Sequence, residues 1–470
     1  MSIFIYNSLT RKKEELIPLN PPQIKMYTCG VTVYDESHIG HARSLYIFDV
    51  LRRYLKYRGF DVSFVRNITD IDDKIINRAN ELKIDWRALV NKYIDSYDED
   101  LKLLGIQRAD FEPRATENIP DMVKCIESLI DKGYAYETGG DVYFNVRKFP
   151  GYGKLSGQSI DQMEKGVRIE PSELKKDPLD FALWKTSKEN EPSWDSRFGN
   201  GRPGWHIECS VMSQKFLETD TLDIHAGGRD LIFPHHENEI AQAEALSGKP
   251  FAKYWLHHGL LTINGQKMAK SLGNFITIKD FIAKYNDINI LKMFFLSAHY
   301  ASPVDFTHEK MLESKQALER ILILLDKIER QGVERRLVVA SKKFKEIEEI
   351  KNKFIEAMDD DFNMPQGLAC LFELVNLTNK NIDDLDFVAS AKNLLFELED
   401  IFGLDLKKRI YSEEITSGAK IINIPKLIDK RNTARKKGDF KEADDIRKEL
   451  EEKGIILEDT KDGTTWRRRL

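Results

Sequence analysis

One segment near the N-terminus constrains the fold most, because it predicts a strand, a helix and a second strand in close succession. Residues 25–33 have the composition of a strand ending in Thr-Cys-Gly, and residues 62–65 are short, β-branched and aromatic. A helix is predicted from Gly40 to Gly59, because apolar side chains recur on one face at Leu45, Phe48, Leu51 and Leu55. Such a unit implies parallel strands with a ligand site at their carboxyl ends. The fold class expected is therefore α/β.

The chain is too long for a single ordinary core. Its 470 residues predict roughly three or four domains at about 150 residues each. Gly, Pro, Trp and charged residues mix without a period between the two halves of the α/β domain, which indicates an insertion, and the chain becomes helical from Glu309. The expected domains are the first α/β half, the insertion, the second α/β half, a helical bundle and a small C-terminal domain, at 1–138, 139–204, 205–308, 309–410 and 411–470.

The C-terminal seventy residues have their own pattern. A weak, polar stretch at 411–420 is interpreted as a linker, and residues 425–437 and 440–453 predict a helical hairpin. The Asp462-Gly463 dipeptide predicts a final strand turn.

Composition excludes several classes of protein. With 41% hydrophobic and 32% charged residues, the chain is typical of soluble globular proteins. No apolar run approaches the roughly 18 residues of a membrane span, and the N-terminus lacks the order of a signal peptide. Four scattered cysteines favour a reducing compartment over a disulfide framework, so a cytoplasmic location is expected.

The first chemical motif is His38-Ile39-Gly40-His41, between the first strand and the first helix. Imidazoles at a helix N-terminus can contact phosphate oxygens, Gly40 allows close approach, and free helix N–H groups with the dipole favour negative charge. If only these four residues are considered, two surface histidines in a turn are an equally good explanation of the motif.

The second motif is Lys267-Met268-Ala269-Lys270-Ser271, which lies between Gly265 and Gly273. Two lysines in a Gly-flanked loop can clamp a polyphosphate and offset the charge that builds up as pyrophosphate leaves. A Lys-rich loop by itself is usually only solvated. The order of the two motifs, the phosphate turn early and the lysine loop late in one α/β domain, is more informative.

A third set of residues suits a metal ion. His235 and Glu239 are spaced i, i+4 and share one face of a helix, whereas Cys29 and Cys209 are distant in sequence. Two thiolates, an imidazole and a carboxylate suit zinc. The residues alone leave open a structural role for either cysteine and the replacement of His235 by His236.

Taken together, these motifs resemble the class I aminoacyl-tRNA synthetases, and most closely their cysteinyl-tRNA synthetase family. The resemblance runs along the whole chain and is carried by the segments YTCGVTVYD (27–35), NITDIDDK (67–74), GWHIECS (204–210), FPHHENE (233–239) and TTWRR (464–468). One departure is Ala269, where the family loop has Ser. Both lysines of the loop are present, so altered loop hydrogen bonding with retained activity is expected.

The resemblance implies a Rossmann-type parallel-sheet catalytic domain with an insertion, a helical bundle and an anticodon-binding C-terminal domain. It implies a role for each matching residue: Cys29, Cys209, His235 and Glu239 as zinc ligands; Gly30, Thr69, Trp205 and His225 around the substrate cysteine; His38, Gly40, His41, Asp230, Lys267 and Lys270 with ATP and Mg²⁺; and Arg431, Arg435, Trp466 and Arg467 with tRNA. From the residues alone, Asp230 is as well explained by capping the next helix, and Thr69, Trp205 and His225 by core or turn positions. The acidic residues after Thr69 are interpreted as structural or as tRNA-end contacts.

The implied activity is ATP-dependent ligation of L-cysteine to tRNA(Cys) through a cysteinyl-adenylate, with zinc selecting the substrate thiolate. His38, His41, Lys267 and Lys270 would be the catalytic groups, and a monomer is expected.

Three alternative functions agree less well with the sequence. A related ligase that joins cysteine to an amino-sugar lacks the C-terminal domain that residues 421–470 predict here. Intact phosphate motifs argue against a non-catalytic RNA-binding protein. Four protein ligands with two thiolates leave no open position for the water of a zinc hydrolase.

Overall fold

The computed structural model describes residues 2–160, 163, 175–189, 191–331, 344–406, 414–417, 420–460 and 463–468. The chain divides into two compact units, the first formed by Met1–Leu312 with Asn352–Cys370 and the second by Glu313–Lys351 with Leu371–Leu470. Among the described residues, none of the helices combines the length and apolarity that a bilayer span requires.

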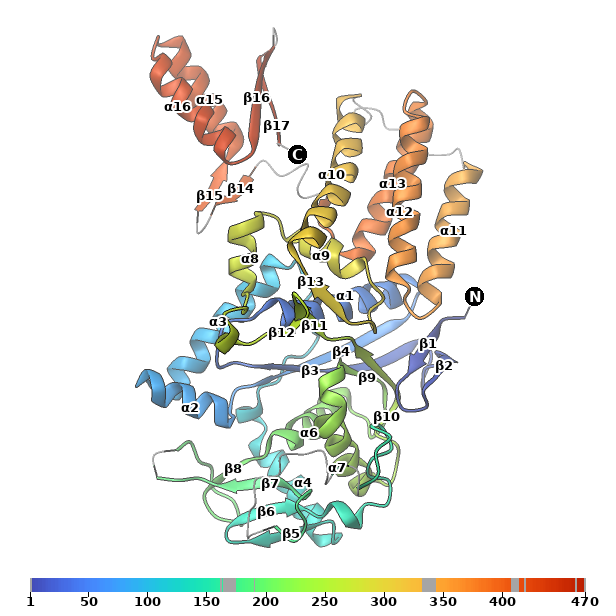
Figure 1. Ribbon diagram of the computed structural model, residues 1–470, viewed down its shortest axis with the longest axis vertical. Helices are drawn as coiled ribbons and strands as arrows, with labels where there is room; N and C mark the ends of the chain where they lie inside the picture. The colour runs from blue at the N-terminus through green and yellow to red at the C-terminus, as the bar shows by residue number, and fades with distance from the viewer. Residues whose placement is uncertain are drawn as a thin grey trace. The chain divides into compact units, whose positions relative to one another are not determined.

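A four-stranded parallel sheet forms the centre of the first unit (Figure 1). Its order is β10-β9-β3-β4, and each neighbouring pair is parallel. The strands are β3 (Gln23–Thr32), β4 (Asp61–Thr69), β9 (Leu222–Gly228) and β10 (Ala252–His258). The sequence order runs outward from β3 to β4 on one side and from β9 to β10 on the other. The carboxyl ends of all four strands therefore meet at one edge, where open α/β sheets bind ligands.

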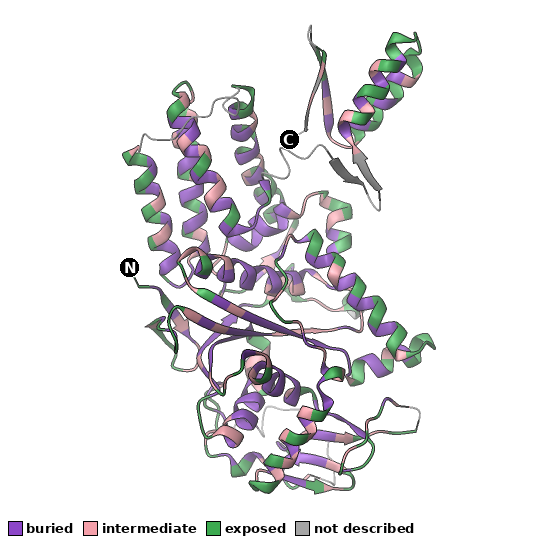
Figure 2. Cartoon of the chain, turned by 180° about the vertical axis from the view of Figure 1, so that it is seen from behind, coloured by how far each residue is buried: buried purple, intermediate pink, exposed green. Residues whose placement is uncertain are grey.

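Helix α1 (Ile39–Tyr57) makes the crossover between β3 and β4, so the predicted α/β unit is confirmed. The predicted apolar face is buried, at Leu45, Phe48, Leu51 and Leu55. Figure 2 shows the same contrast between buried and exposed sides of the helices that flank the sheet. Gly59 follows with φ +88°, a conformation that glycine adopts without strain.

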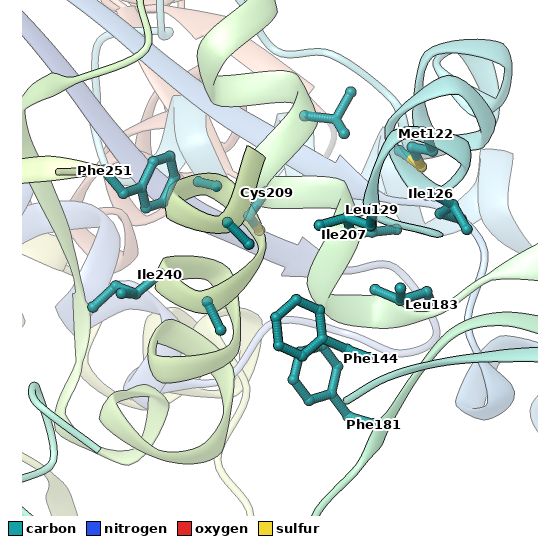
Figure 3. Packing of buried hydrophobic residues seen from close by; sticks show 14 of the residues in the cluster. Met122, Ile126, Leu129, Phe144, Phe181, Leu183, Ile207, Cys209, Ile240 and Phe251 are labelled. Carbon is teal, nitrogen blue, oxygen red and sulfur yellow. The ribbon is translucent and has the colours of Figure 1, made fainter. Parts of the chain in front are cut away.

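A second, antiparallel sheet lies in the region assigned to the insertion, although β5 begins before residue 139. Its order is β5-β6-β7-β8, from Ala135–Thr138, Asp141–Phe144, Phe181–Thr186 and Gly201–Pro203. Helix α4 (Ile119–Asp131) and α6 (Trp205–Leu217) contribute to the hydrophobic cluster beside it (Figure 3). The rings of Phe144 and Phe181 stack with centroids 5.0 Å apart. This cluster includes Cys209 and therefore extends from the inserted sheet to the predicted metal site.

The described chain before His308 contains further helices and strands. They are β1 (Phe4–Asn7), β2 (Lys12–Glu15), α2 (Asp73–Leu82), α3 (Trp86–Leu103), α7 (Glu237–Ser247), β11 (Leu261–Ile263), β12 (Gln266–Lys267), α8 (Ile278–Tyr285), α9 (Ile288–Leu296) and β13 (Val304–Phe306). Strand β11 pairs with β12 and β13, and the second motif lies at the end of β12.

The chain is helical from His308, as predicted. The helices are α10 (His308–Arg330), α11 (Lys345–Asp359), α12 (Met364–Lys380) and α13 (Leu385–Phe402). The apolar positions of α10 that step by three and four are buried, at Leu318, Ile321, Leu325 and Ile328.

The predicted helical hairpin and the final pair of strands are present, while Asp462 of the predicted strand turn lies outside the described residues. Helices α15 (Ile424–Lys436) and α16 (Phe440–Glu452) are followed by β16 (Ile455–Thr460) and β17 (Gly463–Arg468), which pair antiparallel. The Asp439 side chain caps α16 by accepting the Glu442 N–H. These elements share a small core formed by Ile424, Ile428, Ile446, Leu450, Ile455 and Leu457.

The interpretation of residues 411–420 as a linker needs correction. Residues 411–413 and 418–419 lie outside the described chain, but β14 (Glu414–Ser417) and β15 (Lys420–Asn423) pair antiparallel. Two strands of four residues are too short to show a period, so the stretch looked structureless in the sequence.

Candidate functional site

Residues far apart in sequence come together at the carboxyl ends of the sheet. Cys29 and Gly30 lie near the end of β3, and Thr69 is the last residue of β4. Cys209 is on α6, and Glu239 is in the first turn of α7. The parallel sheet therefore converts distances of up to 210 positions in the chain into side-chain contact.

The four predicted metal ligands form one cluster, in which the ligand atoms all lie within 4.8 Å of one another. Cys29 Sγ is 3.4 Å from Glu239 Oε1, and Cys209 Sγ is 3.5 Å from His235 Nε2. His235 Nε2 is 2.8 Å from Glu239 Oε1, as the i, i+4 spacing predicts. Cys209, His235 and Glu239 are at most 1% exposed, so their polar atoms depend on each other or on a bound ion.

The electrostatics of the cluster favour the ionised forms of Cys209 and Glu239, whereas burial and the neighbouring Cys209 raise the pKa of the Cys29 thiol well above its usual value. Burial raises the pKa of the Cys209 thiol, but a hydrogen bond with Cys29 and the interaction with the His235 imidazole lower this pKa to about 6. Burial lowers the pKa of His235, but Glu239 and Cys209 outweigh burial and raise it to about 10. Histidine charges hold the pKa of Glu239 well below its usual range despite burial. A zinc ion would take the place of the His235 proton.

The donor set fits zinc in composition and nearly in spacing. A tetrahedron with Zn–N and Zn–O bonds of about 2.0–2.1 Å separates its N and O ligands by about 3.3 Å. The separation of 2.8 Å between His235 Nε2 and Glu239 Oε1 is therefore that of a hydrogen bond, and about half an ångström of opening would admit the ion.

A second, overlapping donor set shares Cys29 and Glu239 but uses His225 and His236. His236 Nε2 lies 3.3 Å from Cys29 Sγ, and His225 Nε2 lies 2.6 Å from Glu239 Oε2. The alternative of His236 as a ligand is thus geometrically sound. His236 Nδ1 is hydrogen-bonded to His257 Nε2 at 2.8 Å, an outer contact comparable to that of His235 Nδ1 with His206, so these contacts do not decide between the two imidazoles.

Two aromatic neighbours surround the imidazole of His235. The Trp205 ring stacks on it with centroids 4.0 Å apart, and His206 Nδ1 lies 2.8 Å from His235 Nδ1. Outer contacts of this kind fix the orientation of a metal-binding imidazole. Trp205 is 37% exposed, which places it between the cluster and solvent.

Asn67 is a site residue to which sequence reasoning gave no role. Its Oδ1 accepts hydrogen bonds from Gly30 N at 2.8 Å and Tyr27 Oη at 2.9 Å, and Cys209 Sγ lies 3.9 Å away. Its Nδ2 donates to Thr69 Oγ1 at 3.3 Å. Asn67 therefore joins the ends of β3 and β4 beneath the cluster; its only sequence signal was membership of the 67–74 motif.

Thr69 and His225 are both buried core residues and neighbours of the cluster. Thr69 Oγ1 donates to Glu208 Oε2 at 2.6 Å, and Glu208 precedes Cys209 on α6. The His225 ring stacks on Trp255 with centroids 4.4 Å apart while its Nε2 faces Glu239. For Thr69 and His225, the interpretation as core positions and the interpretation as pocket positions are therefore compatible.

The phosphate turn is organised by its own histidines. His38 is the N-cap of α1, and its Nδ1 accepts from Gly40 N at 3.1 Å and His41 N at 3.3 Å. His41 Nδ1 in turn accepts from His38 N at 3.4 Å, and the rings stack 3.7 Å apart. Since each Nδ1 is an acceptor, each ring carries its proton on Nε2. Burial lowers the pKa of His38 to about 4 and that of His41 to about 3, so both rings are neutral.

This arrangement corrects the expectation of free N–H groups at the start of α1. The Gly40 and His41 N–H groups are capped by His38, and Ile39 N donates to Ile276 O at 3.1 Å. A phosphate bound at this turn would therefore be contacted by imidazole Nε2–H groups and favoured by the helix dipole.

The lysine loop lies against this turn. A side chain at Gly40 would come within 3.4 Å of Met268 Cε, and the rings of His38 and Phe275 are 5.2 Å apart. Lys267 is exposed, and Lys270 is exposed and forms an ion pair with Asp35. The two motifs, about 230 positions apart in sequence, are thus adjacent in space.

The loop carries its own internal hydrogen bonds at the unusual Ala269. The Ala269 N–H donates to Asn274 Oδ1 at 2.8 Å, and Asn274 Nδ2 donates to Lys267 O at 3.2 Å. Asn274 therefore holds the backbone between the two lysines without help from a side chain at position 269.

Asp230 is exposed in the short helix η3 (Arg229–Leu231), just after β9. In the described chain, neither η3 nor the following π-helical segment, η4 (Ile232–His236), has a side-chain capping bond. The capping alternative for Asp230 therefore finds no support here, and the carboxylate faces solvent at the sheet edge.

The acidic residues after Thr69 have structural partners. Asp70 accepts from the N–H and hydroxyl of Thr116 at 2.9 and 2.6 Å, and Asp72 caps α2. Asp73 pairs with Lys185 and with an arginine of β8. These contacts agree with the structural interpretation.

In the C-terminal domain, the predicted tRNA residues lie on α15 and β17. Arg431 is 4% exposed, and its two terminal nitrogens each lie 2.9 Å from an Asp459 oxygen. Arg435 is exposed and contacts the same carboxylate at 2.9 Å, which confirms that Arg431 and Arg435 share one face of α15. Trp466 is half-buried against the small core, and Arg467 is opposite Ile456. Packing alone accounts for Arg431, and its role toward tRNA stays a prediction.

Comparison with known proteins places the chain in a family. The family described as tRNA synthetases class I (C) catalytic domain matches residues 15–316, the DALR domain matches 353–407, and the cysteinyl-tRNA ligase anticodon binding domain matches 423–467. A cysteine–tRNA ligase of Aquifex aeolicus is 48% identical, covering 100% of this chain and 99% of the relative. Another, of Persephonella marina, is 50% identical with 100% of each chain covered.

Solved structures show the same fold at low sequence identity. Methionyl-tRNA synthetase of Mycobacterium tuberculosis with methionyl-adenylate gives a TM-score of 0.59 at 13% identity, covering 82% of this chain and 91% of that one. A LeuRS–tRNA–LeuAMS complex of Agrobacterium radiobacter gives 0.61 at 11% identity, covering 83% and 85%. With three family matches along its length and relatives of about half-identical sequence, the chain belongs to the cysteinyl-tRNA ligase family of class I aminoacyl-tRNA synthetases and is an enzyme of that class.

Proposed function

We propose that the chain ligates L-cysteine to tRNA(Cys) at the expense of ATP, through a cysteinyl-adenylate. The observation that carries this proposal is the buried cluster of two thiols, an imidazole and a carboxylate at the edge of the sheet. Its member Cys29 lies on β3, the strand that leads into the phosphate turn, so a substrate side chain and a nucleotide can be bound side by side.

In the first step a cysteine carboxylate oxygen bonds to the α-phosphorus of ATP. The bond from that phosphorus to the bridging oxygen breaks, and pyrophosphate leaves with Mg²⁺. No proton transfer is needed, so the rate depends on positioning and on charge stabilisation. The Nε2–H groups of His38 and His41 would donate to phosphate oxygens, and Lys267 and Lys270 would offset charge on the leaving group. Asp230 would bind the ribose hydroxyls.

In the second step a hydroxyl oxygen of the terminal adenosine of tRNA, the 2′-hydroxyl by the class I pattern, bonds to the cysteinyl carbonyl carbon. The bond from that carbon to the phosphate oxygen breaks, and AMP leaves with the hydroxyl proton. Recognition of the anticodon would fall to the C-terminal domain, through Arg435, Trp466 and Arg467, with Arg431 supporting the same face.

Zinc would be held by Cys29, Cys209, His235 and Glu239. When bound it would hold the substrate sulfur as a thiolate, either as a transient fifth ligand or in place of a weak ligand such as Glu239. A serine hydroxyl cannot match this at neutral pH. The rest of the amino acid would lie among Gly30, Thr69, Trp205 and His225, which surround the cluster.

This function is tested by amino-acid-dependent ATP–pyrophosphate exchange with each of the twenty amino acids, followed by charging of tRNA. Cysteine alone should support strong exchange. Stronger exchange with any other amino acid would refute the assignment.

The Cys209→Ser variant should retain zinc more weakly than wild type by over 100-fold, because loss of a ligand exceeds the 10–100-fold cost of losing an outer contact. Cysteine binding should weaken in parallel. Competition with a chelator and equilibrium dialysis measure the two quantities. Cys125→Ser is the matched control, since that thiol lies in α4 outside the cluster. Active wild-type protein without zinc would remove the hypothesis.

The Lys270→Ala variant should slow adenylate formation by about 10²-fold, with little change in the affinity for cysteine. Its charge would matter mainly in the transition state, where a single lost donor costs that much. Single-turnover measurement of adenylate separates the rate from binding. Lys284→Ala, an exposed lysine on α8, is the control. A change in the cysteine KM alone would mean that Lys270 has a different role.

A further inference from the structure

Glu237 is a fully buried carboxylate that takes no part in the chemistry proposed above. It stands two positions after His235 and two before Glu239 in the chain, and it is 0% exposed. Its Oε1 accepts from Gly153 N at 2.9 Å. Its Oε2 accepts from Leu155 N at 3.1 Å and Ser156 N at 2.8 Å. A loop more than eighty positions earlier in the chain therefore directs three backbone N–H groups at this one side chain.

The segment that carries the metal ligands lacks the support of a regular helix. His235 lies in the π-helical segment Ile232–His236, where Phe233 has a non-helical backbone with φ −137° and ψ 133°. Helix α7 then begins at Glu237 without a side-chain cap. An irregular helical turn at a functional site needs fixing from outside, because its own hydrogen-bond ladder is interrupted.

The same loop also fixes the next residue. Tyr152 Oη donates to Asn238 Oδ1 at 2.5 Å, and both residues are buried. Two consecutive residues between the ligands are thus bonded to residues 152–156, whereas the side chains of His235 and Glu239 meet within the cluster. The loop therefore holds the residues that separate the two ligands.

We propose that the Glu237 carboxylate and the backbone N–H groups of Gly153, Leu155 and Ser156 form a clamp that positions His235 and Glu239 for the metal ion. Glu237 is on this account a positioning residue, and the inserted segment helps to build the metal site without supplying a ligand. The inference rests on the proposed zinc site.

Glu237→Gln is the direct test, because it preserves shape and removes only the charge and one acceptor. Three N–H donors face the carboxylate, and an amide would present its own NH₂ group to at least one of them. Zinc retention against a chelator should fall by about 10–100-fold, the range measured for outer partners of metal ligands. In the cobalt(II)-substituted protein, the d–d bands should shift as the ligand geometry changes, a signature that a simple loss of stability would not produce.

A second variant perturbs the clamp from the loop side. Gly153 has φ +96°, and a Cβ there would lie 2.2 Å from Gln158 O, so Gly153→Ala must displace the loop. This substitution should weaken zinc retention in the same direction, and the double variant should be no worse than the more affected single one. Glu244→Gln is the matched control, because this carboxylate is on the same helix and contacts the same loop through Lys154 at 2.5 Å.

The outcomes separate this inference from the function on which it rests. Wild-type protein that binds no zinc contradicts the proposed metal site. Wild type that binds zinc, with Glu237→Gln retaining it equally and giving an unchanged cobalt spectrum, overturns the clamp alone. Strictly additive effects of Glu237→Gln and Gly153→Ala on zinc retention also overturn the clamp. This comparison needs only zinc content, so it can be made even if Glu237→Gln folds too poorly for spectroscopy.

Discussion

Pyrophosphate exchange is expected to be at least about 10⁴-fold faster with cysteine than with serine, the level reached when a site is built around one polar group of its substrate. The two amino acids differ by one atom, and shape alone would discriminate far less. The donor cluster offers a chemical difference instead, since a thiol has a pKa near 8.5 and becomes a metal-bound thiolate readily.

The measurement compares initial exchange rates at saturating ATP, with the serine free of contaminating cysteine. The Cys125→Ser variant should keep the full ratio, whereas Cys209→Ser should reduce it by lowering the rate with cysteine. Exchange with serine within 100-fold of that with cysteine would contradict selection by a thiolate.

Ending the chain at Leu406 is expected to cut tRNA charging by about 10²-fold or more while leaving pyrophosphate exchange within a few-fold of wild type. Stacking of one base is worth about 1–3 kcal/mol, so losing contacts to two bases or more accounts for this factor. The small core of the C-terminal domain is formed by residues from Ile424 onward, so the truncation removes that core as a whole. Ending at Leu406 also avoids cutting between β14 and β15, which pair with each other.

Retained pyrophosphate exchange is the control for folding of the truncated protein. The tRNA charging assay then reports the C-terminal domain alone. Equal charging by the truncated and full chains would show that this domain does not recognise the anticodon. An amino-sugar acceptor would then have to be tested in place of tRNA, although the family match over residues 423–467 argues against it.

Local patterns predicted the elements well where a face or a strand is buried. The period of three and four in α1 and the β-branched run of β4 reflect burial on one side, and both elements are present at the expected places. The i, i+4 relation of His235 and Glu239 is also local, and the two side chains meet. The short hairpin β14–β15 was missed because it has too few residues for a period.

Residue patterns were enough to predict the α/β unit, the helical C-terminal half and, through resemblance, the family and its motifs. The fold was needed to show which distant groups meet: Cys29 with Cys209 and Glu239, the lysine loop with the phosphate turn, and the inserted loop with Glu237. It also decided that His38 caps its own helix and that Arg431 is bonded to Asp459. The physical reason is that residue spacing encodes burial along one element, whereas hydrogen-bond partners depend on how separate segments pack around a parallel sheet.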